Sequence, residues 1–172
     1  MSERVVVSNA GPLMVFAKLN LLHLLKELYV EVLIPEAVYE ETVINGIRCD
    51  FEEAHTLRLF LNQTNWKPIK LLQVPQIIAS TNLDKGEQEA IAWALSKNTL
   101  LLMDEELGRE VAREQGVIVR GSLGILIQAY QKNLIRFEQL RFYFKQISSR
   151  SDIWISSQLC DKLLENIENL SV

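Results

Sequence analysis

Residues 99–119 read TLLLMDEELGREVAREQGVIV. The run TLLLM at 99–103 is almost entirely apolar, which is typical of a strand that is buried on both faces. Residues 105–115 carry a helical pattern, and residues 116–119 end in a short apolar run that predicts a second strand. Two strands joined through a helix are expected to be parallel and linked by a right-handed crossover. This stretch therefore predicts a βαβ unit.

The same alternation runs through the N-terminal half of the chain. Residues 4–8 (RVVVS) and 30–34 (VEVLI) predict strands, and a helical pattern follows each of them. The second of these helices covers residues 35–44, and Pro35 suits its first turn. We expect an α/β fold with a central parallel sheet that is covered by helices on both faces.

The remaining segments are a connector and helices. Residues 62–81 hold two prolines and no sustained period, and they predict a connector with one strand before a helix at 84–96. The C-terminal part then reads as helices at 122–132, 136–147 and 156–166. The tail of the chain is therefore expected to be purely helical.

Length and composition favour one globular domain. The chain has 172 residues, 48% of them hydrophobic, which fits a single domain at 1–172 with a helical C-terminal extension at 137–172. The longest apolar run, residues 90–95, is far shorter than the ~20 residues of a membrane span, and the apolar stretch at residues 5–7 is far too short for a signal-peptide core. We expect a cytoplasmic protein with no membrane segment, in which Cys49 and Cys160 are reduced and buried.

The charge balance limits the classes of function. The chain has 18 Lys and Arg against 22 Asp and Glu, for a net charge of -4. No overall basic field attracts nucleic acid, which argues against a protein that passively coats DNA. Nucleases remain open, because an acidic site that holds a divalent cation binds phosphate through the metal.

Two polar side chains follow predicted strands. Asn9 comes directly after the first strand, and Asp104 follows TLLLM. Ligands of open α/β sheets bind beyond the carboxyl ends of the strands, so both residues are site candidates. Each has a structural alternative: Asp104 as the N-cap of the next helix, and Asn9 as a turn or capping residue.

Two glutamates lie on or beside apolar helix stripes. Glu87 is in line with Ala90 on its helix and points toward the core, although a capping box with Asp84 is the alternative. Glu41 borders the apolar stripe of residues 35–44. Glu89 falls on a different face, for which we expect a solvated role.

These residues together indicate a metal site. Carboxylates that converge on one end of a sheet repel each other unless a cation neutralises them, and oxygen ligands without His or Cys select Mg²⁺ or Mn²⁺. Such ions promote phosphodiester hydrolysis. No glycine-rich nucleotide loop occurs, and His23 and His55 are predicted to be structural. We expect Arg109 to form intrahelical ion pairs with Glu106 and Glu110, and a phosphate contact is the alternative role.

Four stretches carry a family resemblance. They are VVVSNAGPLMVFAKLNLLHLL, VLIPEAVYEE, LDKGEQEAIAWAL and LLMDEELGREVAREQGVIVRGSLGIL, at residues 5–25, 32–41, 83–95 and 101–126. In this order they resemble a PIN domain of the compact prokaryotic branch, similar to the VapC ribonuclease toxins. The resemblance covers nearly the whole chain.

The resemblance implies a fold, an activity and a site. It implies a three-layer α/β/α sandwich whose acids gather at the carboxyl ends of the central strands, bind Mg²⁺ or Mn²⁺ and cleave RNA. By resemblance, Asn9 takes the first acidic position, Glu41 the helix glutamate, Glu87 the third acid and Asp104 the fourth. Ser122 matches a hydroxyl that lines such sites. A homodimer and a small antitoxin partner are also implied.

Asn9 departs from the pattern, because many relatives carry Asp there and an amide oxygen is a neutral, weaker metal ligand. Two hypotheses follow. The first is a metal-dependent endoribonuclease that uses Asn9, Glu41, Glu87 and Asp104. The second is a catalytically weak or inactive module of the same fold that binds RNA or protein. A phospho-acceptor domain is disfavoured, because Ser8 and Asn9 stand where an acidic pair is needed.

Overall fold

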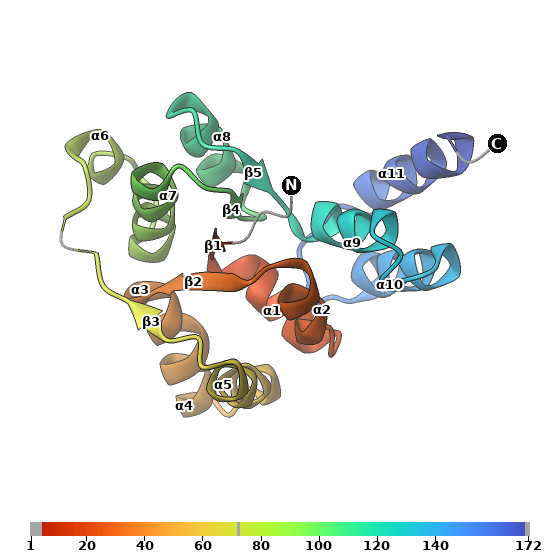
Figure 1. Cartoon of the computed structure of the whole chain (residues 1–172), viewed down its shortest axis with the longest axis horizontal. Helices are drawn as coiled ribbons and strands as arrows, with labels where there is room; N and C mark the ends of the chain where they lie inside the picture. The colour runs from red at the N-terminus through yellow and green to blue at the C-terminus, as the bar shows by residue number, and fades with distance from the viewer. Residues whose placement is uncertain (1–4, 72, 171–172) are drawn as a thin grey trace. The chain divides into compact units, whose positions relative to one another are not determined.

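The computed structural model describes residues 5–71 and 73–170. The chain divides into two compact units, Met1–Ser122 and Leu123–Val172 (Figure 1). The first unit contains the sheet and the candidate site residues, and the second contains helices only in its described part. The expectation of one folding unit with a helical extension from residue 137 stays a prediction.

Five strands form a parallel sheet in the order β3-β2-β1-β4-β5. They are β1 (Val5–Ser8), β2 (Glu31–Pro35), β3 (Pro68–Ile69), β4 (Leu101–Leu102) and β5 (Val119–Arg120). Val7 of β1 pairs with Leu33 of β2 and with Leu101 of β4, so β1 has a neighbour on each side. The predicted parallel sheet is confirmed. Arg4, which the sequence assigns to the first strand, and residue 72 of the connector lie outside the described residues.

Helices precede or follow every strand of the first unit. They are α1 (Ala10–Lys18), α2 (Leu22–Leu28), α3 (Glu36–Tyr39), η1 (Glu40–Asn45), α4 (Gly46–Arg48), α5 (Glu52–Thr64), α6 (Gln76–Ala79), α7 (Lys85–Lys97) and α8 (Glu106–Glu114). The regular helix predicted at 35–44 is wrong in one respect, because η1 is a π-helix. The hydrogen bonds of a π-helix span one residue more than those of an α-helix, which the spacing of apolar residues does not reveal.

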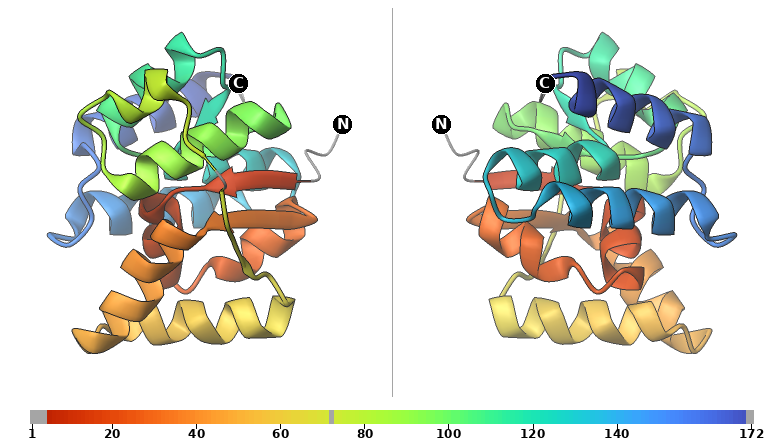
Figure 2. Two further views of the ribbon diagram at one scale, coloured as in Figure 1. Left: turned by 90° about the vertical axis from the view of Figure 1, so that its left-hand side faces the viewer. Right: turned by 90° about the vertical axis from the view of Figure 1, so that its right-hand side faces the viewer.

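Both faces of the sheet are covered. α7 packs on β1, β2 and β4. Figures 1 and 2 show α7 on one side of the strands and α1 on the other. Val7 and Leu101 are fully buried, as continuous apolar strands between two helical layers should be. The three-layer α/β/α arrangement is therefore confirmed, and it brings the carboxyl ends of β1 and β4 to one edge.

The second unit consists of helices in its described part. α9 (Ser122–Gln131) enters it, and α10 (Phe137–Ser149) packs against α11 (Ser157–Leu170). α10 buries Leu140, Phe144 and Ile147 along one face. The three predicted C-terminal helices are confirmed. Among the described residues, no helix is both long enough and apolar enough to span a membrane.

The two cysteines have different environments. Cys160 is buried on α11, as expected. Cys49 is exposed, so the prediction of a buried thiol is wrong there. It lies in the turn after α4, where Asp50 has a positive φ of 58° and the chain reverses toward α5. Side chains in such a turn face solvent.

Candidate active site

Asn9 lies at the carboxyl end of β1, beside the end of β4. Its backbone N–H donates to the carbonyl of Leu102 over 2.9 Å, which ties the two strands together. Asn9 is at the N-cap position of α1, but its side chain makes no capping hydrogen bond. The residue is 6% exposed, and its Oδ1 is a buried oxygen with no donor among the described residues. Capping therefore does not explain Asn9.

Asp104 is held by hydrogen bonds to a residue 18 positions away. Its Oδ1 accepts from the backbone N–H of Ser122 over 2.7 Å, and its Oδ2 accepts from the Ser122 hydroxyl over 2.6 Å. The N-cap of α8 is Glu105, so the structural alternative, in which Asp104 caps this helix, is wrong. Ser122 is fully buried, and in the structure its hydroxyl contacts Asp104. Ser122 therefore orients the acid.

Two glycines allow the chain to approach Asp104 closely. A Cβ atom on Gly121 would lie 2.9 Å from Asp104 Oδ1 and 2.7 Å from Arg109 Nη1, and a Cβ on Gly11 would lie 3.3 Å from Asp104 Oδ2. The Gly11 contact brings Asp104 to the first turn of α1, next to Asn9. The two residues that follow β1 and β4 thus meet at one edge of the sheet.

Arg109 lies beside Asp104. Its Nη1 donates to the backbone carbonyl of Met103 over 3.0 Å, and its Nε is 4.0 Å from Glu106 Oε2. Burial raises the pKa of Asp104, although the Ser122 hydrogen bonds and the Arg109 charge act in the opposite direction. The default ion pair of Arg109 with Glu106 is confirmed, and the guanidinium also stands next to a candidate acid.

The second group of acids consists of Glu41, Asp84 and Glu87, here called the glutamate cluster. Asp84 and Glu87 form the predicted capping box: the Glu87 N–H donates to Asp84 Oδ1 over 2.8 Å, and the Asp84 N–H donates to Glu87 Oε2 over 2.9 Å. Glu87 is only 7% exposed. Glu87 therefore closes the capping box and is also buried.

Glu41 reaches the glutamate cluster from η1. The residue as a whole is exposed, but its Oε2 lies 3.4 Å from where a Cβ on Gly86 would stand, so the carboxylate rests against α7. Burial of the carboxylate, followed by the charges of Asp84 and Glu87, raises the pKa of Glu41. The glutamate cluster is therefore a set of acids that repel one another.

Glu87 connects the two groups. Its Oε1 lies 3.5 Å from the Cβ position of Gly108 on α8, the helix that begins shortly after Asp104. Burial raises the pKa of Glu87, and the charges of Asp84 and Glu105 raise it further against the lowering effect of the Asp84 N–H. Glu105 also raises the pKa of Asp104. Glu87 thus lies on the side of α7 that faces α8.

The side chains near this edge have donor atoms of the kind that bind a divalent cation. The side chains offer oxygen atoms, one of which, Asn9 Oδ1, is buried without a donor, and the acids have raised pKa values. Such a donor set fits a hard ion. Within the part of the chain that the structure describes, however, no three His, Cys, Asp or Glu side chains are spaced to hold a metal. A metal site made by Glu41, Glu87 and Asp104 stays a prediction.

Two acids have roles that the sequence did not reveal. The sequence predicts Asp84 only as a cap, yet its charge also acts on Glu41 and Glu87. The predicted solvated role of Glu89 is wrong: the residue is 9% exposed, and its Oε2 accepts from the backbone N–H of Ala37 over 3.1 Å. The available signal was the alanine content of α7, because a helix packed on more than one face buries small residues outside its main stripe.

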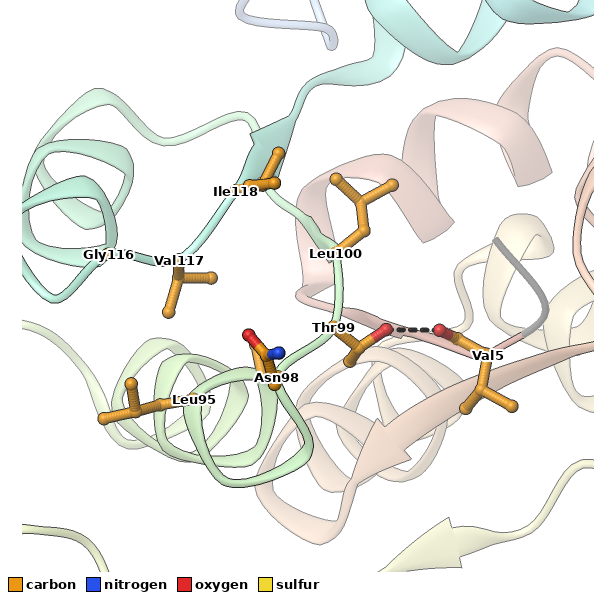
Figure 3. A pocket seen from close by; sticks show the side chains of 9 residues that line it. Val5, Leu95, Asn98, Thr99, Leu100, Gly116, Val117 and Ile118 are labelled. Atoms are coloured by element: carbon orange, nitrogen blue, oxygen red, sulfur yellow. Dashed lines mark hydrogen bonds between the residues drawn. The ribbon is translucent and has the colours of Figure 1, made fainter. Parts of the chain in front are cut away.

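A cavity of about 290 Å³ lies at the opposite edge of the sheet, at the amino ends of β1, β4 and β5. Figure 3 shows Leu95, Asn98, Val117 and Ile118 around it, and the hydrogen bond that the Thr99 hydroxyl donates to the carbonyl of Val5. None of its lining residues has a titratable side chain. The cavity therefore offers space without acid, base or metal-binding groups.

Comparison with known proteins identifies the family. A sequence model described as a PIN domain matches residues 5–169. The chain belongs to the PIN-domain family, whose members are generally nucleases that use divalent metal ions. No curated protein matches the chain, and no solved structure matches it. The predicted family and fold are confirmed.

Proposed function

We propose that this protein is a metal-dependent endoribonuclease that hydrolyses phosphodiester bonds of RNA at the carboxyl edge of its sheet. The observation that supports the proposal is the meeting of Asn9, whose buried Oδ1 has no donor among the described residues, with Asp104 at this edge. Glu41 and Glu87, whose pKa values are raised by burial as that of Asp104 is, form the neighbouring glutamate cluster. Displaced pKa values cluster at functional sites. The family of the chain agrees with the proposal.

The proposed site uses each side chain in a different way. Asn9, Glu41, Glu87 and Asp104 would hold Mg²⁺ or Mn²⁺, which would supply Lewis-acid activation of the attacking water and neutralise charge on the phosphate. Ser122 keeps the Asp104 carboxylate in one orientation through two hydrogen bonds. Arg109, fixed by the Met103 carbonyl, is the candidate contact for a phosphate oxygen.

The direct test is RNA cleavage by the purified protein in Mn²⁺. Asp104→Asn preserves the size of the side chain and removes its charge, and we expect a loss of about 10²-fold or more in cleavage rate. Glu110→Gln, at an exposed position on α8, is the matched control and should cleave like the wild type. Equal cleavage by wild type and Asp104→Asn would show that a contaminating nuclease is responsible.

The resemblance to VapC-type toxins leads us to propose that the nuclease acts as a homodimer and is blocked by a small antitoxin protein. Expression of the wild-type chain should then arrest growth, whereas Asp104→Asn should not. Growth arrest by both chains would contradict a toxin that acts through this site.

The neutral Asn9 favours a second candidate, a PIN-like module that binds RNA or protein with little or no cleavage. An amide oxygen attracts a cation less than a carboxylate does, which weakens metal binding. Calorimetry separates the two functions. Tight RNA binding in EDTA, together with no cleavage in Mn²⁺ even by Asn9→Asp, would favour the binding module.

A further inference from the structure

Glu89 is a buried carboxylate with a backbone partner on another helix. Its Oε2 accepts from the N–H of Ala37, a residue 52 positions away, over 3.1 Å. Lys85 Nζ stands 3.8 Å from its Oε1, but the Lys85 side chain is 77% exposed, so solvent screens this ion pair. The contact with Ala37 is therefore the specific interaction of Glu89.

The Ala37 amide needs an acceptor from outside its own helix. Ala37 is the second residue of α3, and the first amides of a helix have no partner within it. Pro35 is the N-cap, and it has no side-chain acceptor to offer. Glu89 supplies the oxygen that a Ser or Asp at the N-cap would supply in other helices.

Ala37 and Glu41 belong to one continuous helical segment. α3 passes into η1 at Glu40, whose φ and ψ of -60° and -45° are helical. Ala37 precedes Glu41 by about one turn, so the two side chains lie on the same side of the segment. We therefore expect a change in the position of the Ala37 amide to displace Glu41, because the two residues share one helical backbone.

α7 holds this segment at a second point. A Cβ on Gly86 would lie 3.3 Å from Val38 Cγ2 and 3.4 Å from Glu41 Oε2. Gly86 and Glu89 thus contact neighbouring parts of the same segment, while Glu87, which lies between them in sequence, is on the side of α7 that faces α8. The helix that carries one acid of the proposed site also fixes the segment that carries another.

We propose that Glu89 is a positioning residue that holds the Glu41 carboxylate beside Glu87 by accepting the hydrogen bond of the Ala37 amide. The role is distinct from catalysis, because Glu89 contacts α3 and is assigned no contact with substrate. The inference rests on the proposed function only in taking Glu41 as a site acid.

The first test compares Glu89→Ala with Glu89→Gln. Glu89→Ala removes the acceptor, and we expect Mn²⁺-dependent RNA cleavage to fall about tenfold or more, since small displacements of catalytic groups have effects of this size. Glu89→Gln keeps an acceptor oxygen and should stay within about threefold of the wild type. Lys85→Ala, which removes only the exposed ion pair, is the control and should cleave normally. Unchanged cleavage by Glu89→Ala would overturn the proposal.

A double-mutant cycle tests whether Glu89 acts through Glu41. If it does, Glu89→Ala should lower cleavage further by less than about twofold in a Glu41→Gln background, because effects of coupled residues do not add. The same fold-loss in both backgrounds would overturn the proposal, since Glu89 would then act on something else. Glu89→Asp, which keeps the charge but is too short to reach the Ala37 amide, replaces Glu89→Ala if the alanine variant does not fold.

Amide hydrogen exchange makes the inference independent of activity. We expect the amides of Ala37 and Glu41 to exchange about tenfold faster in Glu89→Ala than in the wild type, and Glu89→Gln to restore slow exchange. If the wild type cleaves no RNA, the proposed function fails, and exchange alone decides the inference. If the Glu41 amide exchanged at the same rate in Glu89→Ala as in the wild type, the inference would be overturned.

Discussion

Asp104 and the glutamate cluster are neighbouring acidic regions with opposite surroundings. Asp104 accepts two short hydrogen bonds from Ser122 and lies beside Arg109. In the glutamate cluster, the charges of Asp84 and Glu87 raise the pKa of Glu41. The backbone N–H groups of the capping box donate to Asp84 and Glu87. Burial is nevertheless the largest cause of a raised pKa at Asp104, at Glu41 and at Glu87.

This difference separates two requirements of an acidic site. The N–H and hydroxyl groups of Ser122 donate to the Asp104 carboxylate and keep it in place, so its position does not depend on a cation. In the glutamate cluster the capping box fixes Asp84 and Glu87, while the repulsion among the three carboxylates is relieved only by a proton or a cation. Removal of Asp104 should therefore weaken the fold, whereas removal of charge from the cluster should strengthen it in the absence of metal.

The largest expected effect is on stability at Asp104. Asp104→Ala leaves the buried N–H and hydroxyl of Ser122 without an acceptor, and we expect a loss of about 3 kcal/mol in the free energy of unfolding. Urea denaturation in EDTA measures this. Glu110→Ala, at an exposed position on α8, should change stability by less than about 0.5 kcal/mol. Equal stabilities of the two variants would remove the distinction between the two regions.

Asn9→Asp adds a charge at the sheet edge beside Asp104. A charged ligand in place of a neutral one should raise Mn²⁺ affinity about tenfold, which corresponds to ~1.4 kcal/mol. The same change should destabilise the metal-free protein, because a second buried acid would stand near Asp104. Isothermal calorimetry with Asn62→Asp, an exposed position on α5, as control measures the affinity. An unchanged affinity would contradict a metal-binding role of Asn9.

Ser122→Ala should have a smaller effect than Asp104→Ala. It removes the hydroxyl hydrogen bond to Asp104 but leaves the bond from the Ser122 backbone N–H, so we expect a loss of about 1 kcal/mol. Because the hydroxyl bond lowers the pKa of Asp104, its removal should raise this pKa further. Urea denaturation and carboxyl-carbon NMR titration measure the two effects, with Ser149→Ala as the control. A fall in the Asp104 pKa would contradict the assigned contact.

The smallest expected effect is the pH dependence that Glu41 contributes. Its pKa in the folded protein lies above the ordinary value of 4.5, so the folded state binds more protons than the unfolded state above that pH. The contribution of Glu41 to metal-free stability should therefore fall as the pH rises from about 4.5 through the raised pKa. Solvent screening at this exposed residue keeps the effect below about 1 kcal/mol.

Comparison of two adjacent variants isolates this contribution. Glu41→Gln should lose less stability than the wild type between pH 4.5 and neutral pH in EDTA, whereas Glu40→Gln, at the exposed neighbour, should follow the wild type. Saturating Mn²⁺ should abolish the difference if Glu41 is a ligand. Parallel curves for Glu41→Gln and Glu40→Gln would show that Glu41 is not repelled by its neighbours.

The sequence predicted the sheet because buried parallel strands are short apolar runs. The runs VVV, VEVLI and TLLLM can be recognised without knowing any contact between distant residues. It also predicted where Asn9 and Asp104 would lie, since residues that follow parallel strands share one edge. For Glu87 it left two alternatives, and both features are present: the residue closes a capping box and is also buried.

The remainder of the site depends on contacts between distant parts of the chain. The hydrogen bonds of Asp104 to Ser122 and of Glu89 to Ala37 join residues that no local period connects. The π-helix that carries Glu41 differs from an α-helix by one residue in the span of its hydrogen bonds, which apolar spacing does not resolve. The burial of Glu89 could not be predicted without knowing that α3 packs on α7.

The cavity at the amino edge has a practical consequence for inhibitor discovery. Its volume of about 290 Å³ and its uncharged lining, in which Asn98 and Thr99 supply polar groups beside aliphatic side chains, make it suited to a small uncharged compound. Such a compound would raise the melting temperature while leaving Asn9 and Asp104, at the other end of the strands, untouched. Thermal-shift screening would then favour stabilisers, and inhibitors would have to be selected by their effect on cleavage.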